Sequence, residues 1–121
     1  MEDDERVRSE YSLTEYKTND KTLKEILESG EILVFQTDYH GKLYNGEYDR
    51  LAFTDKRIIF YRKKGFAFNG WRGTKIFFEE KGTFSKKGIL KIDIGMSEPI
   101  KLEGDLSKIK SLHHQIYLIT S

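Results

Sequence analysis

The chain has 121 residues, 34% of them charged, a formal net charge of +1 and no cysteine. This length fits a single domain of ordinary size, and the absence of cysteine excludes disulfides and thiolate metal sites. No apolar run reaches the ~20 residues of a transmembrane helix, and the charged first residues contain no secretory signal, so we expect a cytoplasmic protein.

Charge is unevenly distributed along the chain. Residues 1–31 contain ten acidic and five basic side chains, whereas residues 38–75 contain nine basic and four acidic ones. We interpret residues 1–18 as an acidic, mobile tail and residues 19–121 as one folded domain. The basic middle is typical of a surface for an anionic partner and equally of a solvated lysine-rich surface, so charge alone leaves both readings open.

A short helix is predicted at the start of the domain. Asn19 or Asp20 can cap it by accepting a hydrogen bond from a free backbone N–H, and Gly30 is expected to end it. Its apolar stripe, at spacings of three and four residues, consists of Leu23, Ile26 and Leu27.

About seven short strands are predicted next, because bulky apolar residues recur in short runs between turn residues. The runs cover residues 32–35, 43–53, 57–61, 66–78, 89–94 and 100–102, with interruptions at 45–46, 70 and 73. Tight turns or loops are expected at residues 54–56, 63–65, 86–88 and 95–99. Residues 90–94 alternate Leu or Ile with charged residues, which indicates a half-buried strand.

The chain ends in a predicted amphipathic helix, capped by Asp105 or Ser107. Its stripe is Leu106, Ile109, Leu112, Ile116 and Ile119. Strands followed by one such helix predict a mainly β fold: an antiparallel, seven-stranded sandwich or partly open barrel with a C-terminal helical cap and a short N-terminal helix. An OB-fold barrel is the nearest alternative, but that fold lacks an obligatory C-terminal helix.

Two segments resemble the bacterial and archaeal pleckstrin-homology-like (PH-like) domains. One is Gly-Glu-Ile-Leu at residues 30–33, and the other is Leu-Ala-Phe-Thr-Asp-Lys-Arg-Ile-Ile-Phe-Tyr at residues 51–61. The resemblance extends over residues 22–120 and implies the same sandwich used as a non-catalytic binding module, including homo-oligomers formed by strand-edge pairing.

A narrower similarity concerns Leu-Tyr-Asn-Gly-Glu at residues 43–47, ahead of residues 54–60, which is similar to the GLUE domain of the endosomal sorting machinery. Some members of that family bind phosphoinositide and ubiquitin, so the similarity implies these two ligands as alternatives. Lipid-binding PH domains place several Lys and Arg around the first strand pair, whereas residues 38–47 here hold only Lys42 and His40 beside acidic ends.

Two sets of binding residues are predicted. An anion or lipid site is expected from cations near the third and fourth strands, Lys42, Arg62, Lys63, Lys64, Arg72 and Lys75. A partner-binding face is expected on the last helix, at Leu106, Ile109, His113 and Ile116. Arg57 is instead predicted to pair with nearby Asp55 and order the turn.

Our first hypothesis is therefore a protein-interaction module, in which a partner or a second copy adds along a strand edge or lies against the last helix. The alternatives are peripheral binding to anionic membrane lipid and GLUE-like ubiquitin binding. Phe66, Phe68 and Trp71 lie among cations, as in nucleic-acid platforms, but the balanced net charge argues against that partner. We expect these aromatic residues to pack in the core or to form a loop that touches a membrane.

No enzyme, metal site or cofactor is predicted. The glycines do not match a phosphate-binding loop, and there is no serine elbow or cysteine nucleophile. His113 and His114 are adjacent on a helix and point about 100° apart, so they do not form a metal pair. Glu79 and Glu80 are neighbours on a strand and point to opposite faces.

Overall fold

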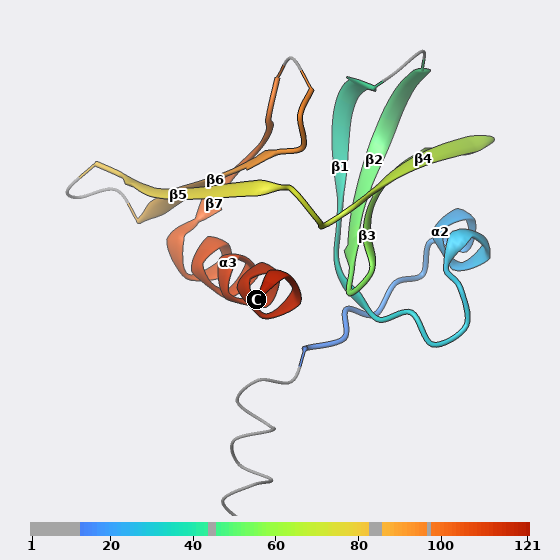
Figure 1. Ribbon diagram of the computed structural model, residues 1–121, viewed down its shortest axis with the longest axis horizontal. Coiled ribbons are helices and arrows are strands. Elements are labelled where there is room, and N and C mark those ends of the chain that lie inside the picture. The colour runs from blue at the N-terminus through green and yellow to red at the C-terminus, as the bar shows by residue number, and fades with distance from the viewer. Residues whose placement is uncertain (1–12, 44–45, 83–85, 97) are drawn as a thin grey trace, which may run out of the picture.

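The structure, a computed structural model, describes residues 13–43, 46–82, 86–96 and 98–121 (Figure 1). Its elements in chain order are α2 (Lys21–Ile26), β1 (Leu33–Leu43), β2 (Gly46–Thr54), β3 (Arg57–Arg62), β4 (Gly65–Gly70), β5 (Lys75–Lys81), β6 (Lys87–Asp93), β7 (Ile100–Asp105) and α3 (Leu106–Thr120). The predicted mainly β architecture with one short and one C-terminal helix is confirmed. In the described part of the chain the sheets do not close into a barrel.

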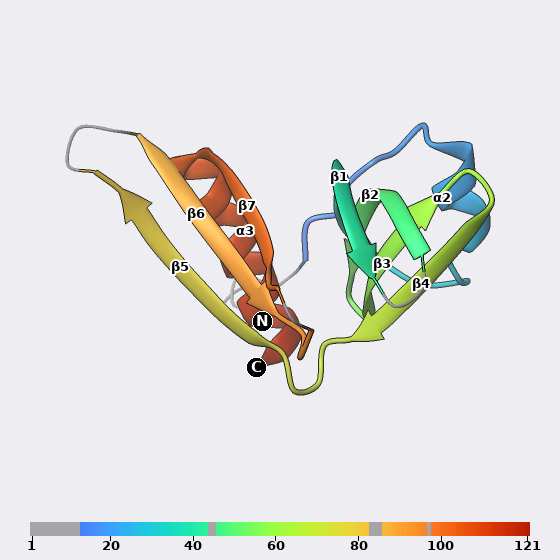
Figure 2. The same ribbon diagram turned by 90° about the horizontal axis from the view of Figure 1, so that it is seen from above.

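The strands form two antiparallel sheets in hairpin order. Sheet A contains β1, β2, β3 and β4 in that order, and sheet B contains β5, β6 and β7. Figure 2 shows the sheets as the two arms of a V, joined where β4 leads into β5. Gly73 in this connection has a φ of +83°, a conformation that glycine adopts without strain. The break predicted at residues 70–73 therefore carries the chain from one sheet to the other.

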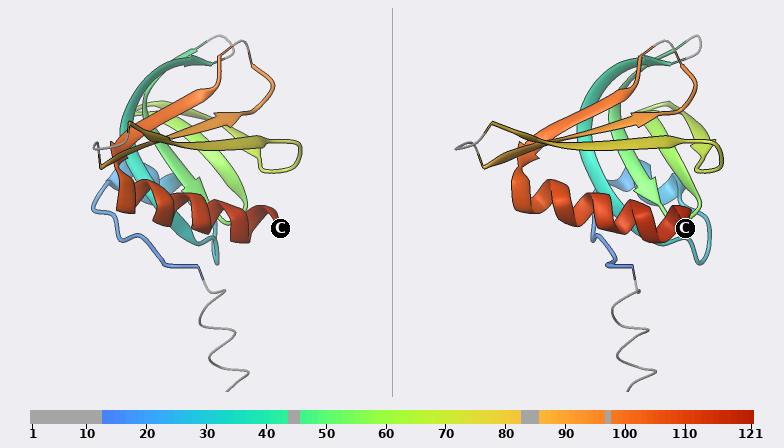
Figure 3. Two further views of the ribbon diagram at one scale, coloured as in Figure 1. Left: turned by 90° about the vertical axis from the view of Figure 1, so that its left-hand side faces the viewer. Right: turned by 60° about the vertical axis from the view of Figure 1, so that its left-hand side comes forward.

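The main core lies between the sheets. Its buried side chains from sheet A are Val34, Leu51, Phe53, Ile58 and Phe60, and those from sheet B and α3 include Leu90, Ile92, Ile100, Leu102, Ile109, Leu112 and Ile116. Figure 3 shows α3 lying across one end of the sandwich. The apolar stripe of this helix is thus used to close the core of its own domain.

A second, smaller core lies on the outer face of sheet A, under α2. It contains the buried residues Leu23, Leu33, Ala52, Ile59 and Tyr61. Strand β3 is therefore covered on both faces, and residues 57–61 are all buried. A strand that is covered on both faces reads as a continuous apolar run, as residues 58–61 do.

Helix α2 starts as predicted but ends earlier. Asp20 is the N-cap, and its Oδ1 accepts hydrogen bonds from the N–H groups of Thr22 and Leu23 at 3.0 and 3.3 Å. The helix ends at Ile26 and not near Gly30, which instead lies in the turn before β1 with a φ of +80°. Part of the reason is that the Ile26 carbonyl accepts a hydrogen bond from Arg57 Nη2 at 3.0 Å, which satisfies a carbonyl at the helix end.

The turn predicted at residues 86–88 is wrong, because Lys87 and Gly88 already belong to β6. Gly88 pairs with Gly104 of β7, beneath α3. A Cβ at Gly88 would lie 3.1 Å from Leu106 Cδ1 and 3.2 Å from Ile109 Cγ2. Glycine is needed here for close packing of the helix on the sheet. Residues 83–85, and the turn predicted at Asn45, lie outside the described residues.

The last part of the predicted tail is attached to the domain. The Tyr16 N–H donates to the Leu33 carbonyl at 2.7 Å, and the Thr14 N–H donates to Gln115 Oε1 of α3 at 2.7 Å. The Tyr16 ring meets Phe35 edge-on, with centroids 6.5 Å apart. Residues 13–18 thus join the domain, whereas residues 1–12 lie outside the described part of the chain.

Candidate functional site

The predicted partner-binding residues of α3 face the interior. Ile109 and Ile116 are 7% and 0% exposed, and Leu106 is half-buried over Gly88. The His113 ring stacks on Phe78, with centroids 5.4 Å apart and 12° between planes. This stripe therefore offers no open face to a partner. The ubiquitin alternative stays a prediction, and it would have to use other residues of the helix.

The predicted anion-binding cations do not form one pocket. Arg62, Lys63 and Lys64 lie at the β3–β4 turn, whereas Arg72 and Lys75 lie at the β4–β5 connection and the start of β5. The six residues of β4 lie between the two groups, and a strand of this length spans about 20 Å. Lys42 belongs to β1, but its side chain lies outside the described residues.

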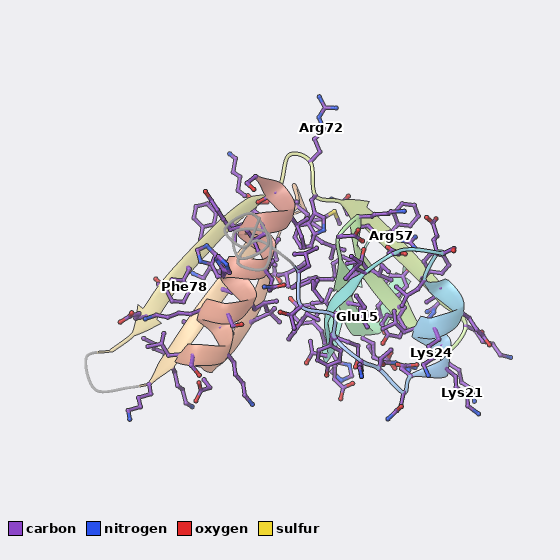
Figure 4. The ribbon with its side chains drawn as sticks, turned by 90° about the horizontal axis from the view of Figure 1, so that it is seen from below. Glu15, Lys21, Lys24, Arg57, Arg72 and Phe78 are labelled. Carbon is purple, nitrogen blue, oxygen red and sulfur yellow. The ribbon has the colours of Figure 1, made fainter. Side chains whose placement is uncertain are left out.

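Most of these cations are available to a ligand. Lys63, Lys64, Arg72 and Lys75 are exposed, and none of them joins an ion pair among the residues that the structure describes. Figure 4 shows Arg72 pointing away from the body of the molecule. Arg62 is more constrained, since its guanidinium lies 5.6 Å from the Tyr48 ring centroid.

The sequence predicted an ion pair between Arg57 and Asp55, and this prediction is wrong. Arg57 pairs with Glu31 instead. Its Nε and Nη2 donate to the two Glu31 carboxylate oxygens at 2.8 and 2.9 Å. The Thr54 hydroxyl donates to Glu31 Oε2 at 2.6 Å. Asp55 has a different role, because its Oδ1 accepts a hydrogen bond from the Ile32 N–H at 2.9 Å. The four residues Glu31, Arg57, Thr54 and Asp55 join the start of β1 to the β2–β3 turn.

The ion pair between Glu31 and Arg57 is a structural anchor, as the pKa shifts of both side chains indicate. Burial raises the pKa of the Glu31 carboxyl, but hydrogen bonds from Arg57, the Glu28 N–H and Thr54 outweigh burial and lower that pKa to about 2. Hydrogen bonding to the Glu31 carboxylate raises the pKa of Arg57. No buried side-chain nitrogen or oxygen in the described ranges lacks a hydrogen-bond partner. The anchor is satisfied internally and needs no ligand.

A second polar contact attaches α2 to sheet A. Asp20 Oδ2 accepts hydrogen bonds from Arg50 Nη1 at 2.9 Å and from the Tyr61 hydroxyl at 2.8 Å. Burial raises the pKa of Asp20, but these bonds and the Leu23 N–H lower it overall. Burial and the Asp20 carboxylate raise the pKa of Tyr61. The cap of α2 is thus also its attachment to the sheet.

Two phenylalanines that the sequence predicted in the core or in a loop lie on the outer strand of sheet A. Phe66 and Phe68 of β4 are 46% and 54% exposed, so they belong to neither the core nor a loop. Their rings stack with centroids 6.3 Å apart, and the Arg57 guanidinium lies 4.9 Å from the Phe68 centroid. Only their alternation with Ala67 in the sequence indicates a strand with one open face.

The backbone of β4 is available for pairing on its outer side. Among the described strands β4 has one neighbour, β3, and a two-residue turn joins them. In such a hairpin the residues that flank the turn, Arg62 and Gly65, form a hydrogen-bonded pair. The alternation of the ladder then directs the N–H and C=O groups of Phe66 and Phe68 away from β3.

Other kinds of site are not found in the described ranges. No group of three or more His, Cys, Asp or Glu side chains there is arranged to hold a metal ion. No helix of the described residues has both the length and the apolarity to cross a bilayer. A scan against models of protein families, a search of curated proteins and a search of solved structures each found no match.

Proposed function

We propose that this chain is a non-catalytic protein-interaction module that binds an extended segment of a partner along strand β4. The observation that carries the proposal is an outer strand without charged residues whose two phenylalanines, Phe66 and Phe68, are half exposed and stacked. In strand addition the main-chain hydrogen bonds supply affinity, and alternate side chains supply selectivity. Strand β4 provides both.

The outer strands β1 and β5 are less suitable. At β1 the Leu33 carbonyl accepts the Tyr16 N–H, and the Tyr39 hydroxyl accepts the N–H of Lys101 in β7 at 3.4 Å. Strand β5 carries charges in ion pairs, Glu79 with Lys91 at 4.0 Å and Glu80 with Lys110 at 3.3 Å. Proteins protect strand edges with charged side chains, and β4 has none.

The position of β4 supports a preformed binding edge. Its neighbour β3 is buried on both faces, and the Glu31–Arg57 pair fixes the start of β3. A partner strand would therefore meet an edge that is already ordered, and ordering an edge on binding is one of the main free-energy costs of association.

Two substitutions at Phe68 test the proposal. Phe68→Pro removes an outward-facing N–H and leaves the β3–β4 ladder, whereas Phe68→Ala keeps this N–H and removes only the ring. Peptides of about ten residues, selected from a random display library on the wild-type chain, should bind Phe68→Ala more weakly and Phe68→Pro hardly at all. Circular dichroism must show that both variants fold. Equal binding to wild type and Phe68→Pro would contradict strand addition.

A second candidate function is peripheral binding to an anionic membrane. It is favoured by the exposed Phe66 two positions after Lys64, because apolar contact and basic charge together attract a protein to such a surface. Under this alternative the chain sediments with phosphatidylserine–phosphatidylcholine vesicles and not with phosphatidylcholine alone. Lys63→Glu with Lys64→Glu would abolish sedimentation, and Phe68→Pro, which keeps all charges, would largely preserve it.

A further inference from the structure

We infer that the segment bound by β4 is acidic at both ends and apolar in its centre; this inference rests on the proposed function. The first observation is in the sequence around the strand. Between Asp55 and Glu79 there are seven Lys or Arg residues and no acidic residue. Strand β4 lies in the middle of this interval, and residues 65–70 themselves are uncharged.

The structure places the cations at the two ends of the strand. Lys63 and Lys64 form the turn before β4, while Arg72 and Lys75 follow it in the β4–β5 connection and at the start of β5. A bound strand of about ten residues would extend past both ends of the six-residue β4. Its end residues would then lie close to these cations, and its centre would lie beside Phe66 and Phe68.

Among the described residues, three lysines of sheet B and α3 form ion pairs with carboxylates, and the cations at the ends of β4 do not. Lys81 of β5 pairs with Glu103 of β7 at 2.7 Å, and Lys91 of β6 and Lys110 of α3 pair with carboxylates of β5. In the described ranges Lys63 and Arg72 have no such ion pair. The positive charge at the ends of β4 is therefore uncompensated and favours a negatively charged partner.

The same charges argue against a second copy of the chain as the occupant. In an antiparallel pairing of two β4 strands, Lys63 and Lys64 of one copy would lie near Arg72 and Lys75 of the other. Like charges that face each other across strands are destabilising. An acidic segment has the opposite effect at both ends.

The centre of the site selects for apolar residues. Phe66 and Phe68 lie on the same face of β4, because they are two positions apart. Alternate residues of an added strand would lie beside these rings, where β-branched and aromatic side chains form the best cross-strand contacts. The bound segment is thus expected to have acidic residues at both ends and apolar residues at alternate positions of its centre.

Three synthetic peptides test the inference on the full chain labelled with ¹⁵N. The first has two glutamates at each end and a centre of alternating valine and threonine, the second replaces the glutamates by lysines, and the third keeps the glutamates and carries prolines in the centre. We expect the first to shift the amide signals of Phe66, Phe68 and Gly70 and to lose affinity with added salt. The second and third should bind at least roughly tenfold more weakly.

Charge reversal provides the sharpest form of the test. Lys63→Glu with Lys64→Glu should lower the affinity for the glutamate-ended peptide roughly tenfold and raise the affinity for the lysine-ended one. The matched control is Lys86→Glu with Lys87→Glu. These two lysines are also adjacent and also precede a glycine, but they lie where β6 of the other sheet begins. This control should leave both affinities unchanged.

The outcomes separate the inference from the proposed function. Equal binding of the glutamate-ended and lysine-ended peptides would overturn the inference and leave strand addition intact. Equal binding of the valine–threonine and proline peptides would overturn strand addition, while preference for acid would remain. If none of the peptides shifts the β4 signals, both are wrong.

Discussion

The guanidinium of Arg57 holds both carboxylate oxygens of Glu31, at 2.8 and 2.9 Å, although 26 residues separate them in sequence. The two side chains are 8% and 0% exposed. Thr54 donates to the same carboxylate, and the Trp71 Nε1–H donates to the Thr54 carbonyl at 2.7 Å. Residues 30–33 and 51–61 therefore have a structural role: they join β1, β3 and the β4–β5 connection.

Removal of one member of this pair should be strongly destabilising. Arg57→Leu leaves a buried carboxylate without its cation, and breaking a buried pair in this way costs about 3–5 kcal/mol of unfolding free energy. Urea denaturation followed by Trp71 fluorescence measures the effect. The double variant Glu31→Gln, Arg57→Leu should be more stable than Arg57→Leu alone. A loss below about 1 kcal/mol for the single change would show that the pair contributes little.

Stability should decrease in acid because of Glu31. The pKa of this carboxyl is about 2 in the folded chain, against an ordinary value of 4.5. Between these values the unfolded chain binds more protons, so the free energy of unfolding falls as pH falls. The contribution of Glu31 is fully present above about pH 5, on the order of 3 kcal/mol, and is lost as pH approaches 2. Denaturation midpoints measured across this range should decline less steeply for Glu31→Gln.

Helix α3 packs close to sheet B at Gly88. Gly88→Ala puts a methyl group within 3.1–3.3 Å of Leu106 and Ile109, which must move to accommodate it. We expect a loss of about 1–3 kcal/mol, as for other overpacked sites. Gly70→Ala is the control, because a Cβ there meets nothing within 4 Å. Thermal unfolding should separate the two variants, and equal midpoints would contradict this account of Gly88.

Asp20 combines two roles that substitutions can separate. Asp20→Ala removes both the N-cap of α2 and the bonds from Arg50 and Tyr61, whereas Asp20→Asn keeps a capping oxygen and removes the charge. The cap alone is worth about 1 kcal/mol, so alanine should cost more than asparagine by roughly this amount. Amide hydrogen exchange in residues 21–26 would report the loosening of the helix. Equal protection in both variants would mean that the cap is dispensable.

The exposed phenylalanines should matter for binding and not for stability. Phe66→Ala with Phe68→Ala removes two surface rings, and most surface substitutions change stability by less than about 0.5 kcal/mol. Arg57 loses its contact with the Phe68 ring, so a small additional loss is expected from that change. Peptide binding should fall at least roughly tenfold in the same variant. A large loss of stability with binding intact would assign these rings to the fold.

The elements of this fold could be predicted from the sequence because their signals are local. The apolar run at residues 57–61, the turns at 54–56 and 63–65 and the stripe of α3 depend on neighbouring residues alone. Errors arose where a residue's neighbour is distant. Gly88 follows two lysines, a pattern that predicts a turn. Its packing neighbours are instead Leu106 and Ile109 of the helix that begins at Leu106.

The candidate site was decided by the tertiary structure. The sequence determined that Phe66, Phe68 and five nearby cations exist, but not that β4 is an outer strand, because strand order depends on how the sheet assembles. That order leaves the outer side of β4 unpaired, between cations that already flank the strand in the sequence. Charge and periodicity are properties of a segment. Exposure and the choice of an ion-pair partner, such as Glu31 for Arg57, are properties of the packed chain.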